Sequence, residues 1–356
     1  MMGKGNPSQP NTPLTRTTVC HIMGLLVTAS SDTAWYRTQK TGNNEVVFME
    51  LDLRILQSVR SFSESFLKSE SRLEILINNT GGNTGIGKAT ALELARRGAR
   101  VIMACRNQEK AELAISDIKR ETGSTDVVYM QLDLGSLQAV RSFTETFLKT
   151  EARLDLLINN AGLVADGRTA DGFGIEFGVN HLGHFLLTCL LLDRLKEGTG
   201  GRVVTLGSMA YRWGNIDFDA LITNKHLGTG RYSWQFFHAY CNSKLCNVLF
   251  NHELAKRLKG TNVTCYSVHP GVVKTELSRN CSLWQRFIIE PIARLLFLDP
   301  ESGAQTTLHC ALQEGIEPLS GRYFFCCAPQ DVVAKGKDDA VAKKLWEVSE
   351  RLSGLF

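Results

Sequence analysis

Short apolar runs alternate with amphipathic segments along most of this chain, and this alternation restricts its fold more than any other feature. Runs rich in Val, Ile and Leu are followed by segments in which apolar residues recur at helical spacing. We expect helices over residues 88–97, 109–121 and 137–150, and strands over residues 100–105, 127–132, 154–159, 201–206 and 263–268. Alternating strands and helices predict an α/β fold, a doubly wound parallel sheet with helices on both faces.

The composition is that of an ordinary globular protein and argues against several classes of function. The chain has 356 residues, 43% hydrophobic and 21% charged, which is enough for one large α/β domain or two smaller ones. Its net charge of +4 comes from scattered Lys and Arg residues, so nucleic acid is not an expected partner. The 10 cysteines include no C-x-x-C pair, which indicates reduced and mostly buried thiols, and no cluster of His and Cys predicts a metal site.

No apolar run in the sequence reaches the roughly 18 residues that a membrane-spanning helix requires. The best candidate near the N-terminus, from Val19 to Ala29, is too short and contains His21. A second apolar segment, from Phe287 to Leu298, is interrupted by charged residues and a proline; it cannot span a bilayer but could lie on one or form a substrate lip. We therefore expect no transmembrane anchor, and a location in the cytoplasm or at the periphery of an intracellular membrane.

An internal repeat links the N-terminal region to the expected domain. Residues 41–81 align without gaps to residues 122–162, and 26 of these 41 positions are identical. Each copy has the pattern strand, helix, strand. We expect residues 1–44 to be disordered because they are polar and aperiodic, residues 45–72 to be a surplus duplicated strand and helix, and residues 73–356 to form a single folded domain. The simplest explanation is a join between two neighbouring duplicated genes, real or made in gene prediction.

The first copy of the repeat ends where a glycine-rich turn begins, and this fusion bears on stability. The strand before such a turn lies mid-sheet, is covered on both faces and is normally apolar throughout. Residues 73–77 could fill that strand, but Asn78 and Asn79 follow where apolar residues are expected. Two buried amides without partners would cost about 1–3 kcal/mol each, so we expect a fold that forms but is weakened.

The turn at residues 80–87, TGGNTGIG, has the spacing of a nucleotide-binding turn. Glycines let the backbone approach a pyrophosphate closely, and the helix that follows offers free N–H groups and a partial positive charge. The pattern alone is a weak signal, which the expected strand before it and the expected helix after it strengthen. The sequence therefore predicts a dinucleotide site at this turn.

Arg106 follows the second strand of the expected sheet, at the position that usually decides between two dinucleotides. An Asp or Glu there would bind a ribose 2′-hydroxyl and favour NAD(H), whereas a guanidinium can pair with a 2′-phosphate. Arg106 therefore predicts NADP(H) in preference to NAD(H), unless it is an ordinary solvated side chain. Asp133, after the third strand, could bind the adenine amino group or cap the helix that follows.

Tyr240 and Lys244 are four residues apart, so they share one face of an expected helix. A tyrosine with an ordinary pKa of about 10 is a poor base at neutral pH, and a nearby ammonium group favours the phenolate and lowers that pKa. Such a pair also arises by chance, so the pair is informative only together with other motifs.

Five motifs come in the same order as in the short-chain dehydrogenase/reductase family, which this chain resembles from about residue 80 onwards. They are the turn at residues 80–87, NNAG at residues 159–162, Ser208 after VVTLG, the Tyr240-x-x-x-Lys244 pair, and HPGVVKT at residues 269–275. The stretches ACRN, VNHLGHFLLT and AYCNSKLCNVLF are most similar to the retinol-dehydrogenase-like branch. The resemblance implies a Rossmann-like fold and an NAD(P)-dependent oxidoreductase that acts on CH–OH groups.

The resemblance also implies a role for each matching residue. Tyr240 would be the general acid in carbonyl reduction and the base in alcohol oxidation, and Lys244 would lower its pKa and hold the nicotinamide ribose. Ser208 would bond the substrate oxygen as charge develops on it, and Asn180 would hold a water that links Lys244 to solvent. Gly81, Gly85, Ile86 and Gly87 would line the pyrophosphate, Asn160 would lie near the adenosine ribose, and Pro270, Gly271, Val273 and Thr275 would face the nicotinamide. The other residues expected at the cofactor are Asn83, Thr84, Ala161 and Gly162.

Aromatic residues gather in the long insert between Ser208 and Tyr240, namely Trp213, Phe218, Trp234, Phe236 and Phe237. Together with the segment from Phe287 to Leu298 they could line an apolar cleft, or they could simply pack the insert down. The leading hypothesis is an NADP(H)-dependent oxidoreductase that interconverts a lipophilic alcohol, retinoid-like or steroid-like, and its carbonyl. The expected partners are that lipophilic small molecule, a second copy of the chain as a homodimer, and the surface of a membrane.

The main alternative is a dinucleotide-binding or scaffold protein that has no catalytic activity because its first strand is replaced. The intact Ser208, Tyr240 and Lys244 favour the enzyme, whereas Asn78 and Asn79 favour the alternative. A hydrolase that uses Ser208 is disfavoured because the sequence has no G-x-S-x-G elbow.

Overall fold

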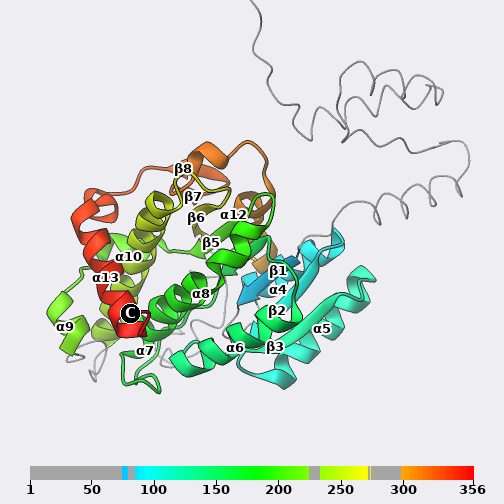
Figure 1. Cartoon of the computed structure of the whole chain (residues 1–356), viewed down its shortest axis with the longest axis horizontal. Helices are drawn as coiled ribbons and strands as arrows, with labels where there is room; N and C mark the ends of the chain where they lie inside the picture. The colour runs from blue at the N-terminus through cyan, green and yellow to red at the C-terminus, as the bar shows by residue number, and fades with distance from the viewer. Residues whose placement is uncertain (1–73, 79–84, 224–232, 272, 274–297) are drawn as a thin grey trace, which may run out of the picture. The chain divides into compact units, whose positions relative to one another are not determined.

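The structure is a computed structural model, and it describes residues 74–78, 85–223, 233–271, 273 and 298–356 (Figure 1). At residues 78, 222, 223 and 233–236 the description is limited to the backbone. The expected disordered region at residues 1–44 and the expected surplus segment at residues 45–72 lie outside the described residues. The same holds for Asn79, Gly81, Asn83, Thr84, Thr275 and all but the last residue of the segment from Phe287 to Leu298.

Eight strands form one sheet in the order β3-β2-β1-β4-β5-β6-β7-β8. The strands are β1 (Glu74–Asn78), β2 (Arg100–Cys105), β3 (Val127–Gln131), β4 (Leu156–Asn159), β5 (Arg202–Leu206), β6 (Thr264–His269), β7 (Tyr323–Phe325) and β8 (Ala328–Gln330). Neighbours from β3 to β7 pair in parallel, and β8 pairs with β7 antiparallel. β2 and β3 follow β1 on one side of the sheet, and β5 to β8 follow β4 on the other side. The strand order therefore reverses between β1 and β4, and open α/β sheets bind ligands at the carboxyl ends of the strands at such a switch point.

Helices connect the parallel strands, and the expected doubly wound α/β fold is confirmed. The helices expected at residues 109–121 and 137–150 are α5 and α6. The α-helices are α4 (Gly85–Arg96), α5 (Gln108–Thr122), α6 (Leu137–Thr150), α7 (Ile175–Phe177), α8 (Gly183–Glu197), α9 (Phe218–Thr223), α10 (Ser233–Arg257), α12 (Pro300–Leu312) and α13 (Asp339–Ser353). A π-helix, η1 (Gly178–Leu182), separates α7 from α8, and the 3₁₀ helices are η2 (Met209–Trp213), η4 (Glu317–Leu319) and η5 (Ala334–Lys337).

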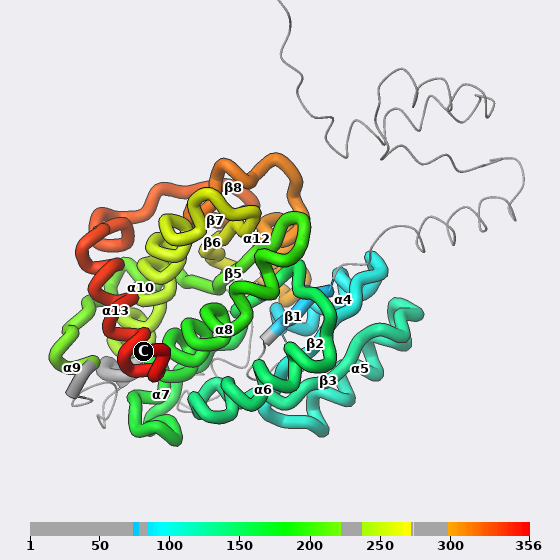
Figure 2. The backbone as a smooth tube through the Cα atoms, in the orientation of Figure 1, coloured from blue at the N-terminus to red at the C-terminus, as the bar shows by residue number. Residues whose placement is uncertain are grey.

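The helices cover both faces of the sheet, as the side chains of β1 illustrate. Ile75 and Ile77 belong to a core shared with α4, α5 and α12, whereas Leu76 belongs to the opposite core shared with α6, α8 and α10. All three side chains are fully buried. The tube in Figure 2 shows α13 running beside α10 and α6 beside α8, which places the C-terminal helix on the second of these two faces.

β1 and β4 come from the two copies of the repeat, and they lie side by side in the sheet. Ile75 pairs with Leu156, and each following residue of β1 pairs with the next residue of β4. Paired residues are 81 positions apart, which is the offset of the repeat. The same offset separates Glu74 from Asp155, and the backbone N–H of Glu74 donates to Asp155 Oδ2 at 2.8 Å. The other edge of β1 pairs with β2. Residues 73–77 were expected to fill the central strand, and β1 lies there one residue further along, at Glu74–Asn78.

Among the described residues, one helical stretch, Ile175–Glu197, is long and apolar enough to cross a membrane by length and composition alone. It consists of α7, η1 and α8. Most of its side chains are buried inside the protein, including Phe185, Leu187 and Leu191 in the core that β4 and α6 share. This setting is that of a core helix.

Candidate active site

Four residues singled out in the sequence come together beyond the carboxyl ends of β4 and β5. Ser208 lies just after β5, Tyr240 and Lys244 lie on α10, and Asn180 lies in the π-helix η1. Because the strands are parallel, their carboxyl ends share one edge of the sheet, and α10 crosses that edge with the face that carries Tyr240 and Lys244.

Lys244 is the buried cation of this site. It is 4% exposed, and its Nζ donates a hydrogen bond of 2.9 Å to Leu206 O at the end of β5. The same Nζ lies 5.7 Å from the centroid of the Tyr240 ring. A Cβ atom on Gly162 would lie 3.4 Å from Lys244 Nζ and 3.8 Å from Asn180 Oδ1. The glycine after β4 thus lies beside both Lys244 and Asn180.

Burial is the largest influence on the pKa values of both Tyr240 and Lys244. It lowers the pKa of Lys244 to about 8, because the ammonium loses hydration. It raises the pKa of Tyr240, while a hydrogen bond shared with the Ser208 hydroxyl acts in the opposite direction. The Ser208 oxygen also accepts from Ala210 N at 3.2 Å, which fixes the hydroxyl at the start of η2. The sequence suggested that Lys244 lowers the Tyr240 pKa; in this structure the lowering influence comes from Ser208.

Asn180 is held rigidly in the π-helix. Its Oδ1 accepts from Leu163 N at 2.9 Å, and its Nδ2 donates to Leu163 O at 3.0 Å and to Ser243 Oγ at 3.1 Å. Its backbone oxygen lies 3.0 Å from Nδ1 of His184, which donates to it. A π-helical turn is a rare insertion that is frequent at functional sites. Here it lets one side chain join the loop after β4 to α10.

The residues expected around the pyrophosphate and the nicotinamide are brought together at the start of α4. Gly85 opens that helix with φ +72°, and Gly271 has φ +86° in the loop after β6, two conformations that favour glycine. A Cβ atom on Gly303 of α12 would lie 3.2 Å from Ile86 Cγ1 and 2.5 Å from Val273 Cγ2. Ile86 and Val273, 187 positions apart by their numbers, therefore meet across one small residue.

His269 ends β6 immediately before Pro270, and it is a buried ring without a hydrogen-bond partner. Its ring stacks on Phe325 with centroids 4.8 Å apart. Both ring nitrogens lack a partner among the described residues, and burial lowers the His269 pKa to about 4. Two unpartnered buried nitrogens beside the Pro-Gly loop are the kind of observation expected where a polar ligand completes a site.

Arg106 and Asp133 lie at the carboxyl ends of β2 and β3. Arg106 is exposed. Asp133 Oδ1 accepts from Gly135 N at 2.9 Å, whereas the side chain that caps α6 is Ser136, which accepts from Ala139 N at 3.3 Å. The interpretation of Asp133 as the cap of the following helix is therefore wrong, because the turn at Gly135 places Ser136 at that position.

The smaller residues after β4 differ in their exposure. Ala161 is buried in the core under α6 and α8, while Asn160 and Gly162 are partly exposed. Gly87 is buried within the first turn of α4. Pro270 is partly exposed at the same sheet edge. All of these positions border the switch point, where a dinucleotide would lie.

The aromatic insert divides into two parts. Trp213, 57% exposed, and Phe237, 40% exposed, place their ring centroids 6.3 Å apart, close in sequence to Ser208 and Tyr240 respectively. Phe218 instead packs against the core below α13, with Lys344 Nζ 4.5 Å from its ring centroid. The packing interpretation thus holds for Phe218, while Trp213 and Phe237 present apolar surface to solvent near the site. The side chains of Trp234 and Phe236 are outside the description.

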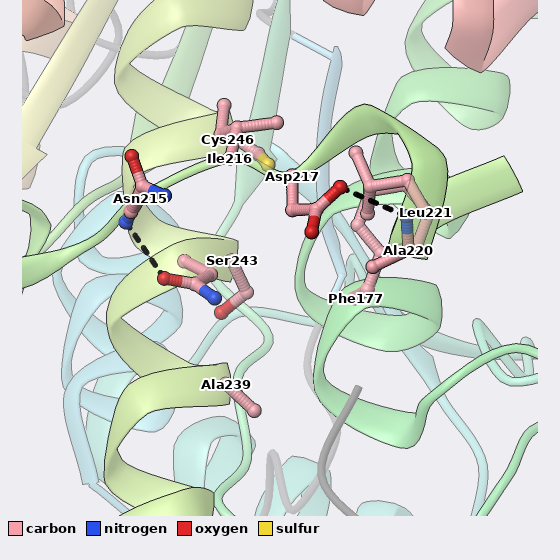
Figure 3. A pocket seen from close by; sticks show the side chains of 10 residues that line it. Phe177, Asn215, Ile216, Asp217, Ala220, Leu221, Ala239, Ser243 and Cys246 are labelled. Atoms are coloured by element: carbon pink, nitrogen blue, oxygen red, sulfur yellow. Dashed lines mark hydrogen bonds between the residues drawn. The ribbon is translucent and has the colours of Figure 1, made fainter. Parts of the chain in front are cut away.

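A small cavity of about 140 Å³ lies on the flank of α10, next to the site (Figure 3). Asn215 N donates to Asn242 Oδ1 at 2.8 Å across it, and Asp217 caps α9 on its far wall. The lining residues are Phe177, Asn215, Ile216, Asp217, Ala220, Leu221, Ala239, Asn242, Ser243 and Cys246. Ser243 also accepts from Asn180, so the cavity adjoins the cluster of Asn180, Tyr240 and Lys244. No sequence pattern marks the cavity, because its wall is assembled from segments that are distant along the chain.

Glu176 is a buried carboxyl group that the sequence did not mark. It is 1% exposed, its Oε1 accepts from Ala165 N at 3.4 Å, and its Oε2 has no partner among the described residues. Burial raises the pKa of Glu176 to about 7, and the Asp166 carboxylate acts in the same direction. The carboxyl ties the loop after β4 to α7, just before the π-helix.

We expect Glu176 to make stability depend on pH. Its folded-state pKa lies above the unfolded value of 4.5, so its contribution is fully present below about pH 4.5 and is lost as the pH rises to about 7. Over that window the loss is on the order of 2 kcal/mol. In Glu176→Gln this part of the pH dependence should vanish, which urea unfolding at pH 5 and pH 7.5 would measure. Glu145→Gln, at an exposed position, is the control; equal pH dependence in all three chains would mean that Glu176 ionises normally.

Comparisons with known proteins agree with this geometry. The family model for short chain dehydrogenase matches residues 80–226 and 222–286. Dehydrogenase/reductase SDR family member 13 of Bos taurus is 52% identical over 278 residues, covering 78% of this chain and 72% of the relative. Retinol dehydrogenase 12 of Homo sapiens is 50% identical over 282 residues, covering 78% of this chain and 85% of the relative.

Solved structures have the same architecture. A crystal structure of an uncharacterized protein from Mycobacterium paratuberculosis superposes with a TM-score of 0.63 and 35% identity, over 80% of this chain and 94% of the other. Salutaridine reductase from Papaver somniferum shares the fold with a TM-score of 0.55 and 21% identity, over 72% of this chain and 100% of the other. The chain belongs to the short-chain dehydrogenase/reductase family, and it is an NAD(P)-dependent oxidoreductase that acts on CH–OH groups.

Proposed function

We propose that this protein interconverts a lipophilic alcohol and its carbonyl with NADP(H), using Tyr240 as the general acid and base. The observation that carries the proposal is the convergence of a buried ammonium, a phenol and a serine hydroxyl at the sheet edge. Lys244 Nζ lies 5.7 Å from the Tyr240 ring, and Tyr240 shares a hydrogen bond with Ser208. The residues that would hold the cofactor border the same edge, where Gly85 and Gly271 adopt positive φ and His269 has unpartnered nitrogens.

Each side chain has a defined task in the proposed reaction. In carbonyl reduction, the Tyr240 hydroxyl gives its proton to the substrate oxygen, and in alcohol oxidation the phenolate takes that proton back. The Ser208 hydroxyl donates to the same oxygen as negative charge develops. The Ser208 hydrogen bond favours the Tyr240 phenolate, and Lys244, charged below a pKa of about 8, would hold the nicotinamide ribose. Bound NADP(H) supplies or accepts the hydride.

Asn180 would keep Lys244 connected to solvent. Both N–H groups of its amide are used by Leu163 O and Ser243 Oγ, and Oδ1 accepts from Leu163 N, which holds the π-helical turn beside the ammonium. Gly162 leaves room between Lys244 Nζ and Asn180 Oδ1 that a Cβ atom would fill. A water in that space could carry protons between Lys244 and solvent.

The apolar rim of the site supports a lipophilic substrate. Met209 follows Ser208 directly, Phe237 precedes Tyr240 by three residues, and both are exposed, as is Trp213. Exposed large apolar side chains that cluster at one place mark a binding surface more often than chance exposure does. The similarity to retinol dehydrogenase 12, which is 50% identical to this chain, makes a retinoid-like alcohol or aldehyde the first class to test.

Arg106 is the basis of the preference for NADP(H). We expect Arg106→Asp to weaken NADPH binding about tenfold to hundredfold, because a charge-assisted pair with a 2′-phosphate is lost. NADH affinity should stay the same or rise. Fluorescence titration of the full-length chain with each dinucleotide would measure both affinities.

A charge reversal at another exposed arginine controls for net charge. Arg120→Asp changes an exposed arginine of α5 and should leave both affinities unchanged. An equal effect of the two reversals, or no effect of Arg106→Asp, would contradict the NADP(H) preference. Turnover of retinal and other lipophilic carbonyls, followed as NADPH oxidation, would then test the substrate class, and turnover of small polar carbonyls alone would contradict it.

A further inference from the structure

Two adjacent cysteines form the tip of the hairpin that joins β7 to β8. Phe325 pairs with Ala328 across this hairpin, so Cys326 and Cys327 make up its whole two-residue loop. Both cysteines are exposed and free. Because β7 is parallel to β6, its carboxyl end lies at the edge of the sheet that carries the candidate active site. The proposed reaction gives these two thiols no task.

The other described cysteines are in a different environment. The remaining six cysteines in the described part of the chain are buried or half-buried. Burial raises the pKa of each of these thiols, to about 12 for Cys105, Cys189 and Cys265, because a buried thiolate loses hydration. The thiolate is the reactive form of cysteine, so these six thiols are inert. Among the described residues, reactive thiols are therefore confined to the hairpin tip.

The two exposed cysteines adopt a conformation that asparagine and glycine usually adopt. φ is +50° at Cys326 and +59° at Cys327, and among the described residues no other side chain but that of glycine has a positive φ. Two-residue hairpin loops with positive φ at both positions favour Asn-Gly, and other residues are strained there. Such strain persists where neighbouring contacts hold the backbone. Here Cys327 N donates to Thr306 Oγ1 of α12 at 3.3 Å.

A disulfide bond between the two thiols would be strained as well. The peptide bond that joins the cysteines is trans, so their Cα atoms lie about 3.8 Å apart. Disulfides usually span about 4.4–6.8 Å between Cα atoms. The bond therefore requires the turn to change shape, and strained, exposed disulfides are readily reduced. The pair is suited to a bond that forms and breaks reversibly, and not to a permanent crosslink.

The hairpin tip adjoins the loop that is expected to face the nicotinamide. The ring of Phe325, the residue before Cys326, stacks on His269 with centroids 4.8 Å apart, and these two residues also pair in the sheet. His269 directly precedes Pro270 and Gly271. A change of shape at the tip would thus reach this loop through one stacked pair of rings.

We propose that Cys326 and Cys327 form a reversible thiol–disulfide site that reacts with low-molecular-weight disulfides, such as oxidised glutathione, and weakens dinucleotide binding when it is oxidised. One cysteine thiolate attacks the small disulfide, forms a mixed disulfide and releases one small thiol. The neighbouring thiol attacks the cysteine sulfur of that mixed disulfide and releases the second small thiol. Two cysteines are oxidised, one small disulfide is reduced to two thiols, and the cysteine protons go to the released thiols. The effect on binding rests on the proposed function, whereas the thiol chemistry does not.

Peptide mass spectrometry of the full-length protein tests the site directly. The tryptic peptide from Tyr323 to Lys335 contains Cys326 and Cys327 and no other cysteine. After treatment with oxidised glutathione and blocking of free thiols, this peptide should have lost two hydrogens and carry no blocking group. Dithiothreitol should restore both thiols. In Cys327→Ser the second thiol is missing, so the peptide should keep one glutathione. A wild-type peptide that stays reduced, or that keeps glutathione without closing the ring, would overturn the proposal.

Fluorescence titration with NADPH tests the link to the loop after β6. We expect oxidation to raise the Kd for NADPH about twofold to tenfold, the worth of one aromatic contact, and dithiothreitol to reverse the change. The double variant Cys326→Asn/Cys327→Gly keeps the turn without its thiols. It should bind NADPH as the reduced wild type does, with or without oxidised glutathione. Cys189→Ser, which removes a half-buried thiol of α8, should respond like the wild type.

Three results would separate the site from its alternatives. An oxidised peptide with an unchanged Kd for NADPH would refute the link through His269. A double variant that still responds to oxidised glutathione would refute it too, because the response would then come from another cysteine. A reduced wild type that binds no NADPH would contradict the proposed function instead, and the peptide masses would then decide the thiol site by themselves.

Discussion

Lys244→Met is expected to abolish turnover and, at the same time, to raise the free energy of unfolding by about 1–3 kcal/mol at pH 7. Lys244 is 4% exposed, and burial lowers its pKa from 10.5 to about 8. The unfolded chain therefore holds this proton more tightly than the folded chain. The buried ammonium therefore lowers the free energy of unfolding. This destabilisation grows as the pH falls from about 10.5 to about 8, and it persists at lower pH.

Methionine matches the length of the lysine side chain without its charge. The hydrogen bond from Nζ to Leu206 O is lost, but that oxygen keeps Asn247 Nδ2 as a donor at 3.3 Å. Urea unfolding at pH 7 and pH 10 would measure the gain, which should shrink by roughly two-thirds at the higher pH, where the unfolded lysine is also losing its proton. Lys149→Met, at an exposed position of α6, should show no gain. A destabilised Lys244→Met chain, or one that still turns over, would contradict this account.

Tyr240→Phe is expected to lower kcat roughly 10²- to 10⁴-fold, because the proton donor of the proposed reduction is removed. The ring remains, so its packing and its distance of 5.7 Å from Lys244 Nζ should persist. The Kd for NADPH and the unfolding midpoint should therefore change little. Stopped-flow or steady-state reduction of a lipophilic aldehyde would measure kcat, and fluorescence titration would measure the Kd.

Tyr129→Phe separates this effect from the general loss of a hydroxyl. Tyr129 lies on β3, and its hydroxyl has no partner among the described residues. Its removal should leave kcat unchanged. Residual turnover of Tyr240→Phe above one-tenth of the wild-type rate would mean that another group donates the proton.

The sheet was predictable because its signals are local. The apolar runs at β2 and β3 and the helical spacing in α5 and α6 are set by nearest neighbours in sequence, and they appear in the structure within two residues of the expected bounds. The residues around Tyr240 and Lys244 were predictable for the same reason, since four residues on a helix fix one face.

The remaining features depend on contacts that no short stretch encodes. Nothing in the sequence GVNHL predicts a π-helix, which arises because Asn180 bonds to Leu163 and Ser243 from other segments. The pairing of His181 with Ser349 joins residues 168 positions apart. That Asp133 does not cap α6 likewise follows only from the structure, where Ser136 caps that helix.

The pairing of β1 with its own copy, β4, has a consequence for how the chain reaches its native state. Two neighbouring positions of the central sheet accept nearly the same sequence, Glu74–Asn78 in one and Leu156–Asn159 in the other, at a constant offset of 81 residues. We expect each segment to be able to pair at both positions during early collapse. The connections that follow, α4 after one strand and the loop to α7 after the other, then select the native arrangement. We therefore expect frustration at the centre of the sheet, with two strand assignments competing while the chain folds.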